Sequence, residues 1–342
     1  MHPDHHDNWV RRLHVTLRDL NGRAYHFEVQ KKNDKFSRAA PWAHRTERKE
    51  NGLVSIFSDL SYRWQHRRFN TPPFRDIVIY EAHLPALSRH PSTKVENESH
   101  RGTYAGARSP AVLKHLQQLR VAVEFLPLHA SDQFLGQDWG YFSTSFRALR
   151  ESYAHNIHET NREVMALIDD MDRRSIPVIL DVVFNHGGEL LVKAWGEDIV
   201  YRRHDNGDFC HGSGCGPTIR TEHPLIRETI IDTLQHLVND YRIDGFRFDL
   251  GALHDKDTML EIDRRLPKHV YLIAEPWALG GVQWGKGDMA HIFANTRWAV
   301  WNDDFREPCR TFLLGEGDFH NRDRVMRAIA GSNIHDGGWA KR

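Results

Sequence analysis

The sequence predicts an α/β protein: a (β/α)8 barrel of the TIM type, incomplete at its C-terminal end and preceded by a small, sandwich-like β segment. Two observations carry this prediction. From residue 76 onward, strongly apolar stretches alternate with amphipathic ones, which is typical of a parallel sheet covered by helices. Charged residues stand where several of the apolar stretches end, and in barrel enzymes that edge of the sheet carries the active site.

The composition is that of an ordinary globular chain. Of its 342 residues 40% are hydrophobic and 27% are charged, and 46 Lys and Arg balance 46 Asp and Glu. Because the chain carries no net charge, neither nucleic acid nor an anionic membrane is indicated as a partner. No apolar run reaches the length of a membrane span, residues 1–7 lack the apolar core of a secretory signal, and three cysteines are too few for a disulfide framework. We therefore expect a cytoplasmic location.

Residues 1–75 are predicted to form a small, partial β domain. A hairpin is expected over 12–30, because apolar residues alternate on both sides of the turn signal Asn21-Gly22. The histidines at positions 2, 5 and 6 could bind a metal, but a solvated terminus is the simpler interpretation.

Six strands are predicted in residues 76–342, ending with one over 299–301. The others lie over 77–83, 121–127, 177–184, 244–249 and 270–275. Helices are expected to begin near Ser109-Pro110, at a capping box formed by Thr160 and Glu163, and at Pro224. The polar segment 187–222 is expected to be a long loop above the barrel.

The number of predicted strands indicates that the barrel is incomplete. A closed barrel of this kind has eight strands, whereas six are found before Arg342. We therefore expect a fragment truncated at its C-terminal end, with exposed strand edges that favour aggregation and make activity doubtful.

The fourth and fifth predicted strands end in ionic residues. Arg247 and Asp249 are two positions apart and so share one face of a strand, and Glu275 ends the next strand. Carboxylates at the ends of consecutive strands are typical of enzymes that cleave glycosidic bonds. Each feature alone has a structural alternative: a buried ion pair for Arg247 and Asp249, and a helix cap for Glu275.

Three motifs, in this order along the chain, resemble the signature regions of the α-amylase family (glycoside hydrolase family 13). They are 181–186 (DVVFNH), 245–249 (GFRFD) and 273–277 (IAEPW). Phe248, Pro276, the segment 138–141 (DWGY) and the segment 301–306 (WNDDFR) are similar to the isoamylase, pullulanase and glycogen-debranching branch. In a branching enzyme, a second acidic residue is expected where this chain has Pro276. The resemblance covers 76–342, and 1–75 more loosely resembles the tail of a glucan-binding sandwich.

The resemblance implies a retaining hydrolase of glycogen- or starch-type α-glucan, acting above all on α-1,6 branch points. Asp249 corresponds to the nucleophile and Glu275 to the general acid and base, whose apolar neighbours should keep it protonated. Arg247 corresponds to the cation that keeps Asp249 ionised. An α-1,4-acting amylase, a glucan branching transferase and an inactive glucan-binding fragment remain open alternatives.

The resemblance also implies residues that bind the sugar. His186 is expected to bond its hydroxyls, Tyr141 to stack beneath it, and Asp181 to order the site rather than react. His254 is expected to contact the substrate beyond the cleavage point or, equally, to begin a helix. Satisfied loop or core residues are the alternatives for His186 and Tyr141.

No cofactor or metal is predicted. Asn185 could help to bind the structural calcium of many amylases, but no acidic cluster accompanies it. Cys210 and Cys215 lack a second pair of ligands, so a glycine-rich loop is more plausible than a zinc site. The family's third carboxylate has one candidate, Asp336, which we expect to be a loop residue because a helical run precedes it.

Overall fold

A computed structural model gives the fold and describes residues 2–3, 9–10, 17–31, 34–50, 52–133, 136, 138–280, 286–315 and 319–331. The chain divides into two compact units, Met1–Trp298 and Ala299–Arg342. Within the described ranges, no helix is both long and apolar enough to cross a membrane. Of the residues singled out above, His5, His6 and Asp336 lie outside the described residues.

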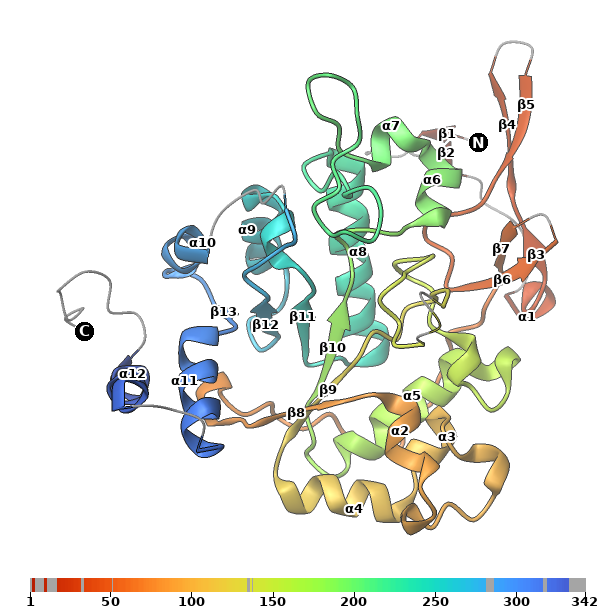
Figure 1. Ribbon diagram of the computed structural model, residues 1–342. Coiled ribbons are helices and arrows are strands. Elements are labelled where there is room, and N and C mark those ends of the chain that lie inside the picture. The colour runs from red at the N-terminus through yellow and green to blue at the C-terminus, as the bar shows by residue number, and fades with distance from the viewer. Residues whose placement is uncertain are drawn as a thin grey trace. The chain divides into compact units, whose positions relative to one another are not determined.

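A six-stranded sheet forms the centre of the fold, and its strands are neighbours in the order in which they occur in the chain (Figure 1). They are β8 (Ile79–Ala82), β9 (Ala122–Phe125), β10 (Val178–Val182), β11 (Gly245–Phe248), β12 (Tyr271–Ala274) and β13 (Trp298–Val300). The pairs from β8 to β12 are parallel. The predicted fold class is confirmed: these are six successive strands of a (β/α) barrel.

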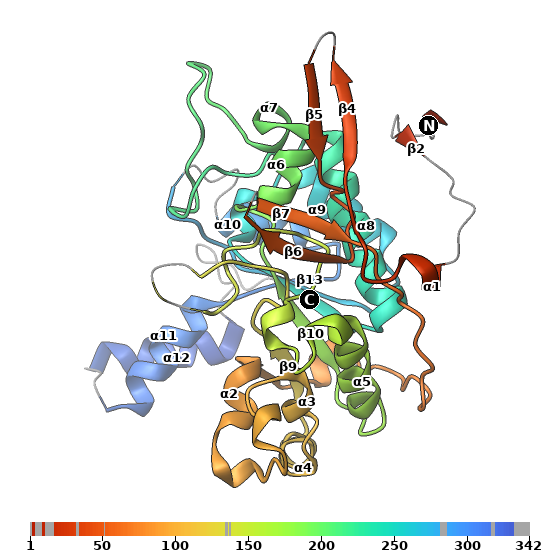
Figure 2. The same cartoon turned by 90° about the vertical axis from the view of Figure 1, so that its right-hand side faces the viewer.

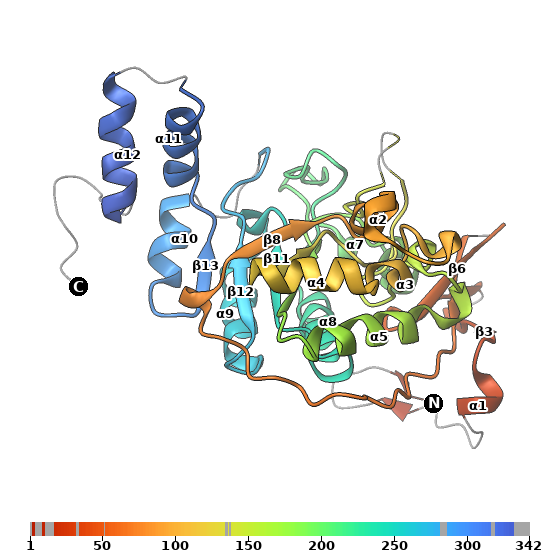
Figure 3. The same ribbon diagram turned by 90° about the horizontal axis from the view of Figure 1, so that it is seen from below.

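Helices lie on the outside of the parallel strands (Figure 3). They include α4 (Pro110–Leu119), α5 (Thr160–Asp172), α8 (Pro224–Tyr241) and α9 (Lys256–Arg265). Each buries an apolar face, as α4 does with Val112, Leu113 and Leu116. Leu119 was expected on the same face but is exposed, at the end of the helix. All residues of β9 to β12 are buried, which explains why these strands read as continuous apolar runs.

Short helices complete the loops of the barrel. They are α2 (Leu84–Arg89), α3 (Tyr104–Ala107), α6 (Glu189–Trp195), α7 (Glu197–Val200) and α10 (Lys286–Phe293). In the second unit, α11 (Asp303–Leu313) and α12 (Phe319–Gly331) pack against each other. There the Asn321 side chain donates to the carbonyl of Pro308 at 3.3 Å.

The predicted capping box of α5 is wrong. Thr160 is the first helical residue rather than the cap, because a single 3-10 turn over Ile157–Glu159 precedes it. The Glu163 carboxylate instead accepts the backbone N–H groups of His155 and Asn156, at 2.9 and 2.7 Å. The side chain thus caps the loop that leads into the helix.

The predicted hairpin over 12–30 is also wrong, although residues 11–16 lie outside the described part of the chain. The helix α1 (Leu17–Leu20) leads into the Asn21-Gly22 turn, where Gly22 has φ +81°. The next strands pair forward. β3 (Ala24–Tyr25) and β6 (Arg45–Lys49) pair with β7 (Gly52–Ile56), and β4 (Phe27–Lys31) forms a long ribbon with β5 (Asp34–Arg38), as Figure 2 shows. β1 (His2–Pro3) pairs with β2 (Trp9–Val10).

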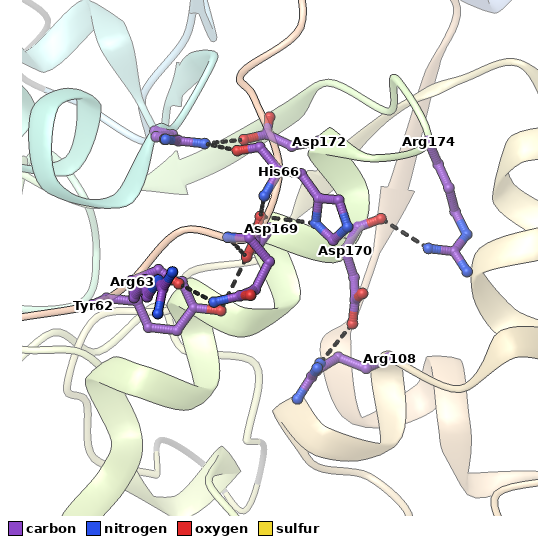
Figure 4. A network of polar contacts seen from close by, with 10 residues as sticks. Tyr62, Arg63, His66, Arg108, Asp169, Asp170, Asp172 and Arg174 are labelled. Carbon is purple, nitrogen blue, oxygen red and sulfur yellow. Dashed lines mark hydrogen bonds and ion pairs between the residues drawn. The ribbon is translucent and has the colours of Figure 1, made fainter.

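An extended segment leads from these strands to the barrel, and it is tied to α5 through one carboxylate (Figure 4). Asp169 accepts the backbone N–H groups of Gln65 (2.7 Å) and His66 (3.0 Å), and the hydroxyl of Tyr62 (3.2 Å). Arg242 donates to the His66 carbonyl at 3.0 Å. These contacts give the polar, irregular segment a fixed path over the outside of the barrel.

Candidate active site

The polar side chains of the site come from the carboxyl ends of neighbouring strands. In the register of the sheet, Asp181 of β10 is beside Arg247 of β11, and Arg247 is beside Ile273 of β12. Paired residues of parallel strands present their side chains on the same face, and so do residues two positions apart. Asp181, Arg247, Asp249 and Glu275 are therefore directed to one face, as the sequence predicted.

Arg247 joins three carboxylates. Its Nη1 lies 2.9 and 3.0 Å from the two oxygens of Asp181 and 3.2 Å from Oδ1 of Asp249, and its Nη2 lies 2.9 Å from Oε1 of Glu275. The arginine is 4% exposed, and its pKa is raised because the attraction of the three carboxylates outweighs burial. One guanidinium thus binds Asp249 through Nη1 and Glu275 through Nη2, and so holds the two carboxylates on the same face of the sheet.

Asp249 has a second partner that sequence reasoning missed. The side-chain nitrogen of Asn185 donates to the carboxylate Oδ2 and to the backbone carbonyl of Asp249, both at 2.8 Å. Asn185 is 1% exposed, so its amide is committed to this contact rather than to solvent. The residue lies in the motif 181–186, but the sequence alone does not reveal the target of its amide.

Glu275 is held by the loop that follows β11. The backbone N–H of Leu250 donates to its Oε2 at 2.7 Å. Leu250 adopts the left-handed conformation with φ +43°, which costs a bulky residue about 1 kcal/mol. A methyl group at Gly251 would lie 2.9 Å from the Glu275 carbonyl oxygen, so the turn must also pass close to the next strand. Burial raises the pKa of Glu275, partly offset by Arg247, in the direction expected from its apolar neighbours.

Tyr141 and His186 lie beside the carboxylates. The hydroxyl of Tyr141 donates to Oδ2 of Asp181 at 2.6 Å. Nδ1 of His186 lies 2.5 Å from Oδ1 of Asn185 and therefore carries the proton, while burial lowers the pKa of the ring. Both residues line a small hollow together with Asp132, Trp139, Gly140, Phe142 and Cys215. An aromatic ring and an imidazole ring thus line this hollow, and each is bonded to a residue of the carboxylate site, Asp181 and Asn185 respectively.

His254 is not brought into this hollow. It has no exposed surface, and its ring lies edge-on to Phe248 with centroids 5.5 Å apart. Phe248 alternates with Arg247 along β11, so its side chain is on the opposite, apolar face of the strand. Burial lowers the pKa of His254 to about 4.

Two further residues near the site were not anticipated. Trp277 makes a side-chain hydrogen bond to Glu275, and Glu124 of β9 is a carboxylate that is only 2% exposed. The signal for Glu124 was its position as the single charged residue in an apolar strand. The thiols of Cys210 and Cys215 are free, and no group of three or more His, Cys, Asp or Glu side chains suited to a metal lies within the described ranges.

Comparison with known proteins points in one direction. The chain is 33% identical over 305 residues to the glycogen debranching enzyme of Yersinia enterocolitica, an alignment that covers 80% of this chain and 44% of the relative. It is 34% identical over 313 residues to that of Dickeya chrysanthemi, with 83% and 46% covered. The chain therefore spans less than half the length of these curated relatives. No protein-family model matches it.

Solved structures show the same likeness. A pullulanase from Bacillus acidopullulyticus superposes with a TM-score of 0.79 and 26% identity, covering 92% of this chain and 43% of that one. The pullulanase from Paenibacillus barengoltzii, in complex with maltohexaose and alpha-cyclodextrin, gives a TM-score of 0.71 and 26% identity, covering 83% and 49%.

Proposed function

The chain belongs to the α-amylase family, in its isoamylase and pullulanase branch, and from this premise we propose that it hydrolyses α-glucosidic bonds with retention. The substrate is a glycogen- or starch-type α-glucan, and the preferred bonds are its α-1,6 branch points. The relatives described as glycogen debranching enzymes and the pullulanase complex with maltohexaose support this choice of substrate and linkage.

The observation that carries the proposal is the bridge from Arg247 to Asp249 and Glu275. Retaining glycosidases need two carboxyl groups about 5–5.5 Å apart, one ionised and one protonated. Here one guanidinium contacts both groups, through Nη1 and Nη2. Burial raises the pKa of Glu275, partly offset by Arg247, in accordance with the role of a general acid.

The reaction proceeds in two displacements. Asp249 attacks the anomeric carbon while Glu275 gives its proton to the leaving oxygen, which leaves a covalent glycosyl–Asp249 intermediate. Glu275, now ionised, takes a proton from water, and the water oxygen attacks the anomeric carbon and releases Asp249. Asn185 and Arg247 keep the nucleophile oriented throughout both steps.

Two side chains bind the sugar in this proposal, and a third orders the site. Tyr141 stacks against the sugar ring, His186 bonds to its hydroxyls, and Asp181 orients Tyr141 and Arg247 rather than reacting. His254 acts behind β11, by packing against Phe248, rather than by touching the glucan.

The proposal extends to the remainder of the chain. Residues 1–75 are a partial β-sandwich that helps to bind glucan, residues 76–342 are the catalytic barrel with 187–222 as its long excursion, and the protein acts in the cytoplasm. No cofactor is needed, because the two carboxyl groups and water supply all the chemistry.

Incubation with amylopectin tests the function. Debranching deepens the colour of the iodine complex and releases linear chains, whereas an α-1,4-acting amylase destroys the colour. A branching transferase fades the colour without forming new reducing ends.

The Asp249→Asn variant is the control. It should bind glucan as the unaltered chain does and should release no chains. If both proteins bind glucan equally and neither releases any product, the chain is a glucan-binding protein and the hydrolase proposal is wrong.

A further inference from the structure

Glu124 lies inside the barrel, beneath the carboxylate site. On β9 it is beside Glu81 of β8 and Ile179 of β10 in the register of the parallel strands. Asp181 is two residues beyond Ile179 and so shares its face, as does Arg247 beside Asp181. Glu124 is therefore directed to the same face as the site, about 7 Å further down the strands.

The charges on this face do not balance. Four carboxyl groups face a single guanidinium, and all five side chains belong to buried residues: Glu124 is 2%, Asp181 3%, Asp249 9%, Glu275 7% and Arg247 4% exposed. Buried carboxylates without a counter-charge are too costly to remain ionised, so part of this charge must be removed by protons.

The hydrogen bonds distinguish Glu124 from the other three carboxyl groups. Asp181, Asp249 and Glu275 each accept from Arg247 and from at least one further donor. By contrast, Oε2 of Glu124 is buried without a hydrogen-bond partner among the described residues. Because no donor stabilises a negative charge on this oxygen, ionisation of Glu124 is unfavourable.

We propose that Glu124 is a positioning residue. It binds a proton because Arg247 alone cannot neutralise the four carboxylates, and when it is ionised its charge sets the pH range over which Glu275 stays protonated. Its role in catalysis rests on the proposed function, whereas the coupling between the two glutamates does not.

The electrostatics of Glu124 agree with this role. Burial raises the pKa of Glu124 to about 7, with Arg247 acting to lower it and Glu81 and Glu275 acting to raise it. Burial also raises the pKa of Asp181, on the adjacent strand, well above its ordinary value, with Arg247 and Tyr141 acting to lower it and Asp249 and Glu124 acting to raise it. Because Glu124 and Glu275 repel each other when both are ionised, each of them is harder to ionise once the other is charged.

The coupling can be measured without substrate. Carbon NMR of the chain labelled at glutamate carboxyl groups follows each titration, and the spectra of Glu124→Gln and Glu275→Gln assign the two resonances. In the unaltered chain, Glu124 should titrate near pH 7. In Glu275→Gln its midpoint should fall by about 0.5–1 pH unit, the size of a like-charge interaction through protein. In Glu124→Gln the midpoint of Glu275 should fall as well, because such coupling is reciprocal.

Glu98→Gln is the matched control, because Glu98 is an exposed glutamate whose ion-pair partner is Arg101. It should move neither midpoint. A Glu124 midpoint near that of an ordinary glutamate, a Glu124 midpoint that is unchanged in Glu275→Gln, or an equal shift in the control would each overturn the proposal.

Activity separates this inference from the proposed function. If the chain releases linear glucan, Glu124→Gln should move the alkaline limb of kcat/KM to lower pH, while the acid limb and the folded structure are kept. Coupled titrations in a chain without turnover would leave the inference standing and reject the hydrolase. If the chain turns over glucan but the two titrations are not coupled, the hydrolase proposal stands and this inference is rejected.

Discussion

The side-chain nitrogen of Asn185 binds Asp249 twice: it lies 2.8 Å from a carboxylate oxygen and 2.8 Å from the backbone carbonyl oxygen of that residue. Asn185→Ala removes this donor from a buried carboxylate. Loss of one buried partner costs about 1–3 kcal/mol, so we expect a lower urea midpoint and a loss of glucan turnover of about tenfold or more. Urea unfolding and iodine assays measure the two effects.

Two variants sharpen this prediction. Asn185→Asp keeps the size of the side chain but places acceptors against a carboxylate, so turnover should fall further than in Asn185→Ala. Asn206→Ala is the control, because Asn206 is exposed and its side chain bonds to Asp208 in its own loop. Turnover in Asn185→Asp equal to that of the unaltered chain would show that the amide does not orient Asp249.

Arg247→Met should be strongly destabilising. The guanidinium contacts Asp181, Asp249 and Glu275 in a buried site, and its removal leaves these carboxylates uncompensated. Breaking a buried ion pair from one side costs about 3–5 kcal/mol. Arg247→Lys restores one charge but cannot span both carboxylates, so it should recover stability more than turnover.

Urea unfolding measures both variants against Arg203→Met. Arg203 pairs with Asp198, which is 90% exposed, and such surface pairs contribute about 1 kcal/mol or less. If Arg247→Met were no more destabilising than Arg203→Met, the three carboxylates would not depend on the guanidinium.

Most of the barrel could be predicted because its signals are local. Each strand from β8 to β12 is an apolar run, and the ionic residues that interrupt the pattern at 247, 249 and 275 mark the edge where the site lies. Their convergence follows from strand order alone, since the carboxyl ends of successive parallel strands meet at one edge.

The missed features depend on contacts between distant segments. Alternation over 25–29 indicates a strand but not its partner, and the partner of β4 proved to lie after it rather than before it. The charged groups that act on Glu124, and the carboxylate that Asn185 binds, likewise come from other parts of the chain, so residue type and spacing could not identify them. Local patterns define elements, whereas pairing and buried polar contacts depend on the assembled chain.

Asp169→Asn should loosen the extended segment that crosses α5. The carboxylate accepts from the backbone of Gln65 and His66 and from Tyr62, and these bonds outweigh burial, so the pKa of Asp169 is lowered. A group with a depressed pKa stabilises the fold above its unfolded pKa of about 3.9, and the contribution is lost as pH falls through the folded value. We expect a loss of about 1–3 kcal/mol at neutral pH that diminishes below pH 4.

Asp170→Asn is the neighbouring control on the same helix, since Asp170 pairs with Arg108 nearer the surface (Figure 4). It should cost about 1 kcal/mol or less. Limited proteolysis within 58–75 should accelerate in Asp169→Asn only. Equal cleavage of the two variants would mean that Asp169 does not hold the segment.

A pair of histidines should make the fold sensitive to acid. Asp240 accepts from Nδ1 of His236 at 2.5 Å, so Nε2 of His236 is left to accept from Nδ1 of His44 at 3.1 Å, and both rings are neutral. The pKa of each histidine is lowered to about 3, mainly by burial and also by Arg147. At His44 the charge of His236 lowers it as well, while Asp240 partly offsets the effect.

The sign of the pH dependence follows from these values. The unfolded chain binds a proton on each histidine near pH 6.5, whereas the folded chain does not until about pH 3, so stability is complete above pH 6.5 and falls as pH decreases toward 3. Between pH 7 and 4.5 each histidine should contribute a loss of about 2 kcal/mol. His44→Gln should lose less stability over this range than the unaltered chain, by about that amount, in urea unfolding at the two pH values. His90→Gln, at an exposed site, should follow the unaltered chain, and parallel losses in all three proteins would show that the buried pair does not cause the acid sensitivity.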